Sequence, residues 1–407
     1  MVAALLACGG IAFGGAQILL TPHHSISTPA GTVVALSNGE ITLEKSATTL
    51  RIGTYGLVWG AAATDASGTP SGATAPSATP AAPSTTPAPS ATAPSTTPAT
   101  GGTPTDTTPA ASGTALIGPT TSTTDTTVTR PITNIQGTLT VGTKVELNPN
   151  LYVGDPQSAL GIPFTNVTVS GELGPMPAWQ VAGTGSTWVI FVHGIDGARV
   201  GGLRPLPTLA ASGLPTLLIT YRNDVGAPPS PDGLIHLGET EWHDLDSAVD
   251  YAQTQGAKKF ILYGDSMGGS IVTQFMQHSA HASAVVGMML DAPVLNWAGV
   301  LQGQADRFHL GFLGGALKQA VTWRANINLA DLDQLDQTAP FERMPVLLFQ
   351  GLSDPLVPPA ESAQFAAALP LSTYVPVTGA THIQSYNVDP ASYTAHLTTF
   401  LAPFAAH

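Results

Sequence analysis

The chain has 407 residues, and its 13 lysines and arginines stand against 26 aspartates and glutamates, which gives a formal net charge of −13. This acidity, without any run of basic residues, excludes nucleic acid as an expected partner. The single cysteine, Cys8, excludes an intrachain disulfide and a cysteine-based metal site. The length permits two or three domains, and the composition assigns one long piece to a linker.

Residues 1–22 form an apolar amino-terminal segment with no charged residue between Val2 and Leu20. As a helix this stretch would be about 28 Å long, enough to cross the hydrocarbon core of a bilayer. We therefore expect a membrane anchor or an uncleaved signal, with the catalytic region outside the cytoplasm. No basic residue precedes Lys45, so the usual orientation signal is missing. A cleaved signal peptide of a secreted protein, lipidation at Cys8 and a buried apolar helix are the alternatives.

Residues 23–60 and 131–163 are expected to form one small β-rich module. Two alternating runs flank Asn38-Gly39, the strongest short hairpin signal, and strand patterns return at 50–59 and 137–147. Between them, residues 61–130 are interpreted as a disordered linker, because every residue from Ala61 to Thr114 is Ala, Ser, Thr, Pro, Gly or Asp. The linker is then a surface insertion that serves as a spacer or carries glycans. A β-rich stalk without a shared core is the alternative.

From residue 164 to residue 407, short β-branched runs alternate with helical patterns. This alternation predicts an α/β domain with a mostly parallel sheet flanked by helices. Residues 293–340 form an insertion for which we expect a small helical cap over the pocket. Its apolar residues either line the pocket for an acyl chain or pack an ordinary crossover, and they are Phe312, Leu313, Leu317, Trp323 and Ile327.

The stretch from Lys259 to Met276 carries the strongest chemical signal in the chain. A short apolar run leads directly into Gly264-Asp265-Ser266-Met267-Gly268, and an amphipathic run of helical period follows. A strand, a sharp turn and a helix in this order predict a nucleophile elbow with Ser266 as the nucleophile. The glycines leave room for a serine held in a strained backbone conformation. A Gly-rich helix start is the alternative interpretation.

Two backbone amides are expected to stabilise a developing oxyanion. The N–H of Met267 begins the helix after the nucleophile and has no intrahelical partner. The second donor is assigned to Ile195, which follows the buried strand ending in His193-Gly194. His193, Gly194 and Asp265 are assigned to substrate binding at the pocket, although the His193 ring is expected to orient its loop more than to do chemistry.

Two further residues complete a candidate catalytic set. Asp354 follows the apolar strand pattern that ends at Gly351, and His382 lies on a Gly-rich loop ahead of the last helix. The order Ser266, Asp354, His382 is the one expected when a histidine activates the serine and an acid holds the imidazole. Asp291 also ends a strand and is the rival acid.

From about Phe164 onward the chain resembles the α/β-hydrolase superfamily, in the branch of serine esterases, lipases and thioesterases. The residues that carry the resemblance are His193-Gly194, the Gly-x-Ser-Met-Gly-Gly stretch around Ser266 and the late Asp354 and His382. The chain is also similar to bacterial membrane-anchored hydrolases of undefined substrate. The resemblance implies an α/β-hydrolase fold with a small helical cap, preceded by a β-rich module and an N-terminal membrane helix.

The expected activity is hydrolysis of a carboxylic ester or related acyl bond through an acyl-enzyme on Ser266. The expected partners are a small-molecule or lipid-like acyl substrate and, through residues 1–22, a membrane. We expect no metal or organic cofactor, since neither His236 nor His243 shows a trustworthy ligand spacing. Alternatives that keep the same three residues are a serine peptidase, an acyltransferase and a cofactor-free perhydrolase. A catalytically dead surface-display module is the alternative from a different class.

Overall fold

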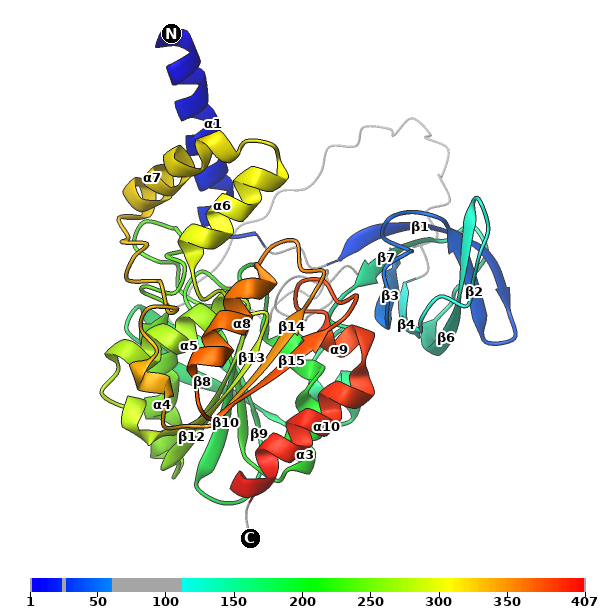
Figure 1. Cartoon of the computed structure of the whole chain (residues 1–407). Helices are drawn as coiled ribbons and strands as arrows, with labels where there is room; N and C mark the ends of the chain where they lie inside the picture. Colours follow the sequence, from blue (N-terminus) through cyan, green and yellow to red (C-terminus); the bar gives the residue numbers. More distant parts are fainter. Residues whose placement is uncertain (1, 24–26, 61–111, 406–407) are drawn as a thin grey trace, which may run out of the picture.

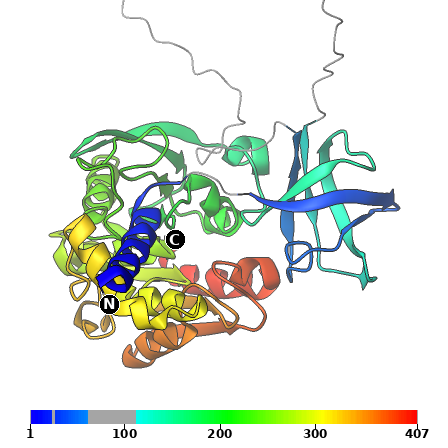
Figure 2. The ribbon, with the colours of Figure 1, turned by 90° about the horizontal axis from the view of Figure 1, so that it is seen from above.

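The computed structural model describes residues 2–23, 27–60 and 112–405. These residues form a seven-stranded sheet and an eight-stranded sheet. The smaller sheet lies to one side of the larger domain in two perpendicular views (Figures 1 and 2).

The seven-stranded sheet is a barrel-like module with a core of its own. Its order is β2-β1-β7-β3-β4-β6-β5, and an additional pairing of β2 with β6 closes it. Apolar side chains from six strands, including Ile41, Tyr55 and Leu147, fill the interior. The strands are β1 (Thr28–Ser37), β2 (Glu40–Glu44), β3 (Tyr55–Trp59), β4 (Gly113–Ile117), β5 (Ser122–Thr123), β6 (Thr127–Gly137) and β7 (Lys144–Asn148).

The hairpin predicted at Asn38-Gly39 is confirmed. Ser37 pairs with Glu40, and the two turn residues have φ values of 46° and 79°. Both angles lie in the left-handed region, which is the geometry that a two-residue turn needs to match the twist of its strands.

The linker boundary at residue 130 is wrong. Residues 113–130 supply β4, β5 and the start of β6, because their alternating Thr and aliphatic residues pair with β3 and β2. Residues 61–111 lie outside the described residues. β3 and β4 are antiparallel neighbours with Trp59 opposite Gly113, so this segment connects two paired strand ends.

The eight-stranded sheet has the order β15-β14-β13-β12-β10-β11-β9-β8. The strands from β15 to β11 run parallel, whereas β9 is antiparallel to both of its neighbours. Together with the helices below, this order confirms the predicted α/β-hydrolase fold. The strands are β8 (Thr165–Gly171), β9 (Gly174–Val181), β10 (Thr187–Val192), β11 (Thr216–Ile219), β12 (Lys259–Asp265), β13 (Val285–Asp291), β14 (Val346–Gly351) and β15 (Ser372–Val377).

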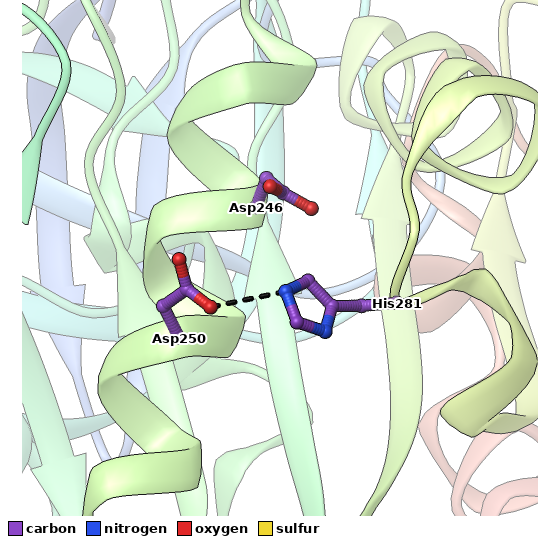
Figure 3. A group of neighbouring side chains, drawn as sticks. All are labelled: Asp246, Asp250 and His281. Atoms are coloured by element: carbon purple, nitrogen blue, oxygen red, sulfur yellow. Dashed lines mark ion pairs between the residues drawn. The ribbon is translucent and has the colours of Figure 1, made fainter.

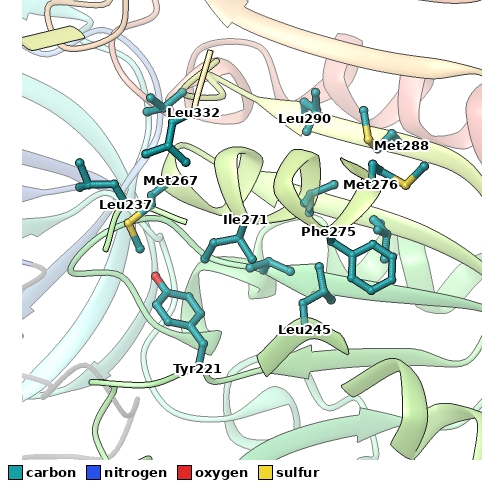
Figure 4. Packing of buried hydrophobic residues seen from close by; sticks show 14 of the residues in the cluster. Tyr221, Leu237, Leu245, Met267, Ile271, Phe275, Met276, Met288, Leu290 and Leu332 are labelled. Carbon is teal, nitrogen blue, oxygen red and sulfur yellow. The ribbon is translucent and has the colours of Figure 1, made fainter. Parts of the chain in front are cut away.

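Helices cover both faces of this sheet (Figure 1). α4 (Trp242–Thr254), α5 (Met267–His278) and α8 (Pro359–Ala368) pack on one face, and α3 (Leu206–Ala211) and α10 (Pro390–Leu401) pack on the other. Figure 4 shows Ile271 and Phe275 of α5 inserted between Leu245 of α4 and the sheet. The short helices are α2 (Pro156–Leu160) and α9 (Ser385–Val388).

The insertion expected at 293–340 contains α6 (Trp297–Arg307) and α7 (Gly314–Ala325). The expected apolar pocket lining is wrong for these helices. Phe312 and Trp323 are 76% and 71% exposed, and Leu313 and Ile327 are buried. Leu317 packs toward α1, where its Cδ1 would lie 3.3 Å from a Cβ at Gly15. These side chains therefore serve the packing of the cap and its surface, and no one of the five lines the candidate pocket described below.

The apolar amino-terminal segment forms α1 (Val2–Leu20), which lies against α7 (Figure 2). Ala16 and Leu20 are fully buried, and Arg324 Nε donates to Gln17 Oε1 at 3.1 Å. Within the described ranges, no helix has both the length and the apolar character required to cross a membrane. The predicted transmembrane helix is thus not supported, and the placement of the chain relative to the cytoplasm stays a prediction.

We expect the barrel to fold when residues 61–111 are replaced by a four-residue turn. Trp59 and Gly113 are already paired, so a short turn can join the two strands. In addition, each halving of a loop lowers the entropic cost of closing it by about 0.6 kcal/mol. The melting temperature, followed by circular dichroism, should equal or exceed that of the full chain. A control chain with residues 61–111 scrambled should melt like the original. Loss of the folded barrel in the short-turn chain alone would contradict the prediction.

Candidate active site

Ser266 occupies the turn between β12 and α5 with a strained backbone. Its φ of 52° and ψ of −117° lie in a region that residues with a side chain rarely adopt. Its N–H donates to Asp291 O at 3.0 Å, and its carbonyl accepts from Gly269 N at 2.9 Å and Val294 N at 3.0 Å. Neighbouring backbone thus holds the strained residue in place, as the elbow pattern predicts.

Three glycines create the space around this turn. A Cβ at Gly264 would lie 2.6 Å from Gly268 C, and a Cβ at Gly268 would lie 2.1 Å from Val192 O. A Cβ at Gly194 would lie 2.8 Å from Ser266 Cβ. No larger residue fits at these positions without moving the backbone that presents the serine.

The three residues of the candidate catalytic set lie within hydrogen-bond distance of one another. His382 Nε2 is 2.8 Å from Ser266 Oγ, and His382 Nδ1 is 2.8 Å from Asp354 Oδ2. A carboxylate only accepts, so the proton lies on Nδ1 and the Nε2 lone pair faces the serine hydroxyl. This is the arrangement in which a histidine can take the hydroxyl proton.

Hydrogen bonds within the protein hold the Asp354 carboxylate, whose side chain is 0% exposed. Oδ1 accepts from Leu356 N at 2.8 Å and Val357 N at 3.0 Å, and Oδ2 also accepts from Gln350 Nε2 at 3.1 Å. These donors orient the carboxylate that faces the imidazole.

The rival acid, Asp291, contacts other groups. Its carboxylate accepts from Ser385 Oγ at 3.1 Å and Tyr393 Oη at 3.2 Å. Burial raises the pKa of Asp291 to about 6, and the nearby Arg204 opposes that rise. Asp291 also binds the Ser266 amide through its backbone carbonyl, so its contacts support the elbow and the last helix.

The two amides predicted to bind an oxyanion belong to residues next in sequence to Ser266 and to Gly194. Met267 begins α5, and Ile195 follows Gly194, whose Cα lies against Ser266. In the part of the chain that the structure describes, neither amide donates to a backbone or side-chain acceptor. Both amides are thus available to a ligand.

The His193 side chain is engaged within the protein. It is 2% exposed, with Nε2 2.8 Å from Asp224 Oδ2 and Nδ1 2.9 Å from Gly194 O. The ring also stacks on Tyr221 at a centroid distance of 4.4 Å. With both ring nitrogens occupied, His193 holds the loop that carries Gly194 and Ile195, and its ring is not free to bind substrate.

A pocket of about 470 Å³ opens beside His382. His193, Gly194, Ile195 and Asp265 line it together with His382, whereas Ser266, Met267 and Asp354 are not among its lining residues. A larger hollow of about 690 Å³ near the carboxyl terminus is lined by none of them. The residues that line the cavity of about 470 Å³, and not its volume, therefore identify it as the relevant one.

Sequence reasoning missed several residues of this pocket. Arg51, Pro149 and Asn150 line it from the barrel module, and Arg307 lines it from the cap. No motif marks them, because each is an isolated residue in a loop or at a helix end. The only available signal is charge, since arginines and lysines are scarce in this chain.

Asp265 is 3% exposed and forms an ion pair with Arg204 at 3.3 Å. Its other oxygen, Oδ1, has no hydrogen-bond partner among the described residues. Burial raises the pKa of Asp265 well above its ordinary value, with Arg204 opposing and Asp291 adding to the rise. One guanidinium compensates two buried carboxyl groups here, so the proton affinity of the pair is high.

A cluster of possible metal ligands lies elsewhere, between α4 and the segment after α5 (Figure 3). Ligand atoms of Asp246, Asp250 and His281 lie within 4.8 Å of one another. His281 Nε2 already contacts Asp250 Oδ1 at 3.0 Å, and Asp246 Oδ1 accepts from the Ser279 hydroxyl. These contacts account for the cluster as pairing between two surface elements. The helical spacing of Asp246 and Asp250 was visible in the sequence, but His281 was not linked to it.

Comparison with protein families finds a match to the prolyl oligopeptidase family over residues 232–401. This range begins before α4, ends at the last residue of α10 and includes Ser266, Asp354 and His382. No curated protein sequence matches the chain.

Solved structures with a similar fold include several esterases. The esterase Pf2001 of Pyrococcus furiosus is 18% identical with a TM-score of 0.49, over 62% of this chain and 94% of that one. The esterase of Pyrobaculum calidifontis is 17% identical with a TM-score of 0.45, over 60% and 86% of the respective chains. The esterase RhEst1 of Rhodococcus sp. ECU1013 is 15% identical with a TM-score of 0.39, over 59% and 98%. The fold assignment itself rests on the strand order and the family match.

Substitution of Gly268, one of the glycines around the Ser266 turn, should destabilise the domain. We expect Gly268→Ala to lower the free energy of unfolding by at least about 3 kcal/mol, because its Cβ would overlap the Val192 carbonyl oxygen. Gly315→Ala is the matched control: this exposed residue of α7 has no atom within 4 Å of an added Cβ. The control should be more stable than the original by about 1 kcal/mol. Urea denaturation measures both, and equal effects would refute the steric argument.

Proposed function

We propose that this chain, which belongs to the α/β-hydrolase superfamily of serine hydrolases, cleaves a carboxylic ester or related acyl bond. The reaction would proceed through an acyl-enzyme on Ser266. The observation that carries this proposal is the hydrogen-bonded line from Ser266 Oγ through His382 to the buried Asp354, with 2.8 Å at each step. A serine hydroxyl is a weak nucleophile until a base removes its proton, and this geometry supplies the base.

In the first half-reaction Ser266 Oγ attacks the substrate carbonyl carbon while its proton moves to His382 Nε2. The carbonyl oxygen becomes an oxyanion, which accepts hydrogen bonds from the free amides of Met267 and Ile195. The tetrahedral intermediate then breaks its bond to the leaving alcohol oxygen. His382 returns the proton to that oxygen, and the acyl group remains on Ser266.

In the second half-reaction water attacks the acyl carbon and gives its proton to His382 Nε2. The Ser266 Oγ–acyl bond breaks, the carboxylic acid departs and the serine regains the proton. Asp354 stays ionised throughout and stabilises the imidazolium that forms in each half. No step in this scheme calls for a metal or an organic cofactor.

Pocket size supports an ester of modest size. A volume of about 470 Å³ is within the range that small-molecule sites occupy. Arg51 and Asn150 from the barrel and Arg307 from the cap line it, and these side chains limit the room for a long substrate chain in the pocket.

Hydrolysis of short peptides is the second candidate, favoured by the match to the prolyl oligopeptidase family. A 4-nitrophenyl ester panel and a matched 4-nitroanilide peptide panel separate the two. We expect kcat/KM to be higher for the esters, and to fall as the acyl group grows beyond the pocket volume. Higher kcat/KM for a peptide anilide than for its matched ester would replace the ester proposal by the peptidase.

Labelling with a fluorophosphonate probe tests the assigned roles. Ser266→Ala and His382→Ala should abolish labelling, and each should lower ester hydrolysis by roughly 10⁶-fold in kcat. Asp354→Asn should lower kcat by about 10⁴-fold, because the imidazole then loses its correct tautomer and its counter-charge.

Asp291→Asn is the matched control for Asp354→Asn, since both substitutions remove one buried carboxylate near the histidine loop. It should retain most of the labelling rate, because Asp291 contacts Ser385 and Tyr393 and not His382. The reverse ranking of these two variants would transfer the acid role to Asp291. A folded original chain that neither labels nor hydrolyses any ester would remove the enzyme proposal and favour the display module.

A further inference from the structure

Two arginines reach the candidate pocket from outside the catalytic sheet. Arg51 lies on the barrel loop between β2 and β3, and Arg307 is the last residue of α6 in the cap. Both line the cavity of about 470 Å³ that His382 also lines. A substrate bound in this cavity would therefore lie beside both arginines and His382.

Neither arginine has an acidic partner within the described ranges, where the ion-paired arginines are Arg204 and Arg222. Arg307 instead lies beside the Phe308 ring at 5.9 Å from its centroid. Arg204 lines the same pocket but differs from both, because it forms an ion pair with Asp265. Free guanidinium groups in a pocket are notable in a chain of net charge −13.

The acidic groups of the pocket are engaged with other partners. Asp265 contacts Arg204, and Asp354, which does not line the pocket, contacts His382. Asp196 also lines the pocket, and its Oδ1 accepts from His23 N at 2.6 Å. These three carboxylates do not neutralise Arg51 or Arg307 by direct contact.

The loop that carries Arg51 is held in a fixed shape by a second, buried arginine. Arg130 is 0% exposed and donates from Nη1 to the carbonyls of Thr49 and Arg51, each at 3.1 Å. It also donates to the carbonyls of Gly53 and Gly118. Burial lowers the pKa of Arg130, and Tyr55, whose ring centroid lies 5.6 Å from Arg130 Cζ, opposes that shift. Arg130 therefore fixes the backbone of the loop that carries Arg51 to the pocket.

The same loop is joined to the histidine loop. The Tyr55 hydroxyl donates to Gln384 Oε1, and Thr54 N donates to Asn387 O at 2.8 Å. Gln384 follows His382 by two residues and lines the pocket as well. These contacts thus fix the loop that carries Arg51 relative to the loop that carries His382.

We propose that Arg51 and Arg307 form a subsite for a carboxylate carried by the substrate, so that this hydrolase selects esters with an anionic group close to the scissile bond. The inference rests on the proposed ester hydrolysis and names its substrate class. A guanidinium binds a carboxylate through short charge-assisted hydrogen bonds, which a neutral group cannot replace. The overall negative charge repels anions at long range, so the selection is local to the two arginines.

Matched ester pairs test the subsite in the full-length protein. The first pair is 4-nitrophenyl hydrogen glutarate and its neutral methyl ester, which place the charge on the acyl side. The second pair is 4-acetoxybenzoate and its methyl ester, which place it on the leaving-group side. We expect kcat/KM for the charged member of at least one pair to exceed that of the neutral member by about tenfold or more.

Removal of the arginines should abolish that preference. Arg51→Gln and Arg307→Gln should each lower the ratio of kcat/KM for the charged ester to kcat/KM for the neutral ester by about tenfold. Arg343→Gln removes an exposed arginine that does not line the pocket and should change neither value. Activity on the neutral ester reports that each variant is folded.

The outcomes separate the subsite from the reaction itself. Hydrolysis of neutral esters without preference for the charged member of either pair overturns the subsite and leaves the ester hydrolase standing. Equal losses on charged and neutral esters in the arginine variants also overturn it, because they would indicate a structural role. Failure of the original protein to hydrolyse any of the four esters would overturn the proposed function and the subsite with it.

Discussion

The buried guanidinium of Arg204 connects the parts of the site that come from different elements. It donates to Ile383 O at 2.6 Å, to Asn387 Oδ1 at 3.2 Å and to Asp265 Oδ2 at 3.3 Å. Asp265 directly precedes Ser266, and Ile383 directly follows His382. One side chain therefore ties the strand of Ser266 to the loop of His382, and Asp265, which is ion-paired with it, helps to compensate its buried charge.

This contact extends into the barrel, which makes the barrel part of the site. Asn387, held by Arg204, also donates from Nδ2 to Thr54 O at 2.8 Å and to Pro149 O at 2.9 Å. A Cβ at Gly53 would lie 2.3 Å from Asn387 O, so the two modules approach closely here. The position of the histidine loop thus depends on the catalytic sheet from one side and on the barrel from the other.

The cap and α1 show how an apolar composition can mislead. Residues 1–22 have the character of a membrane segment, and the cap has the character of a greasy pocket lining. In the structure, Ala16 and Leu20 of α1 are buried, and the cap contributes Arg307 to the pocket instead of an apolar surface. The two elements bury apolar side chains partly against each other, as the close approach of Leu317 Cδ1 to Gly15 illustrates. Apolar residues indicate that a surface will be buried, but they do not indicate which other surface will cover it.

Local stereochemistry explains which features could be predicted. The Asn38-Gly39 turn and the order of strands and helices after residue 164 depend on neighbours in sequence, and both are found. The strained Ser266 turn belongs with them, since the apolar run, the glycine spacing and the helical run that predict it are neighbours in sequence. For the same reason Ser266, Asp354 and His382 stood out at strand ends, and the structure brings their side chains within 2.8 Å contacts.

Features that depend on which surfaces meet were not predictable. The linker boundary failed because β4 has too short a pattern to be separated from its Thr-rich surroundings without its partner strand β3. The positions of Arg51, Arg204 and Arg307 around one cavity follow from the docking of barrel, sheet and cap. The sequence by itself determined the turns and the chemistry of single residues, because those depend on backbone sterics within a few residues. The tertiary structure alone decided the walls and charges of the pocket, because packing joins residues whose separation along the chain carries no local signal.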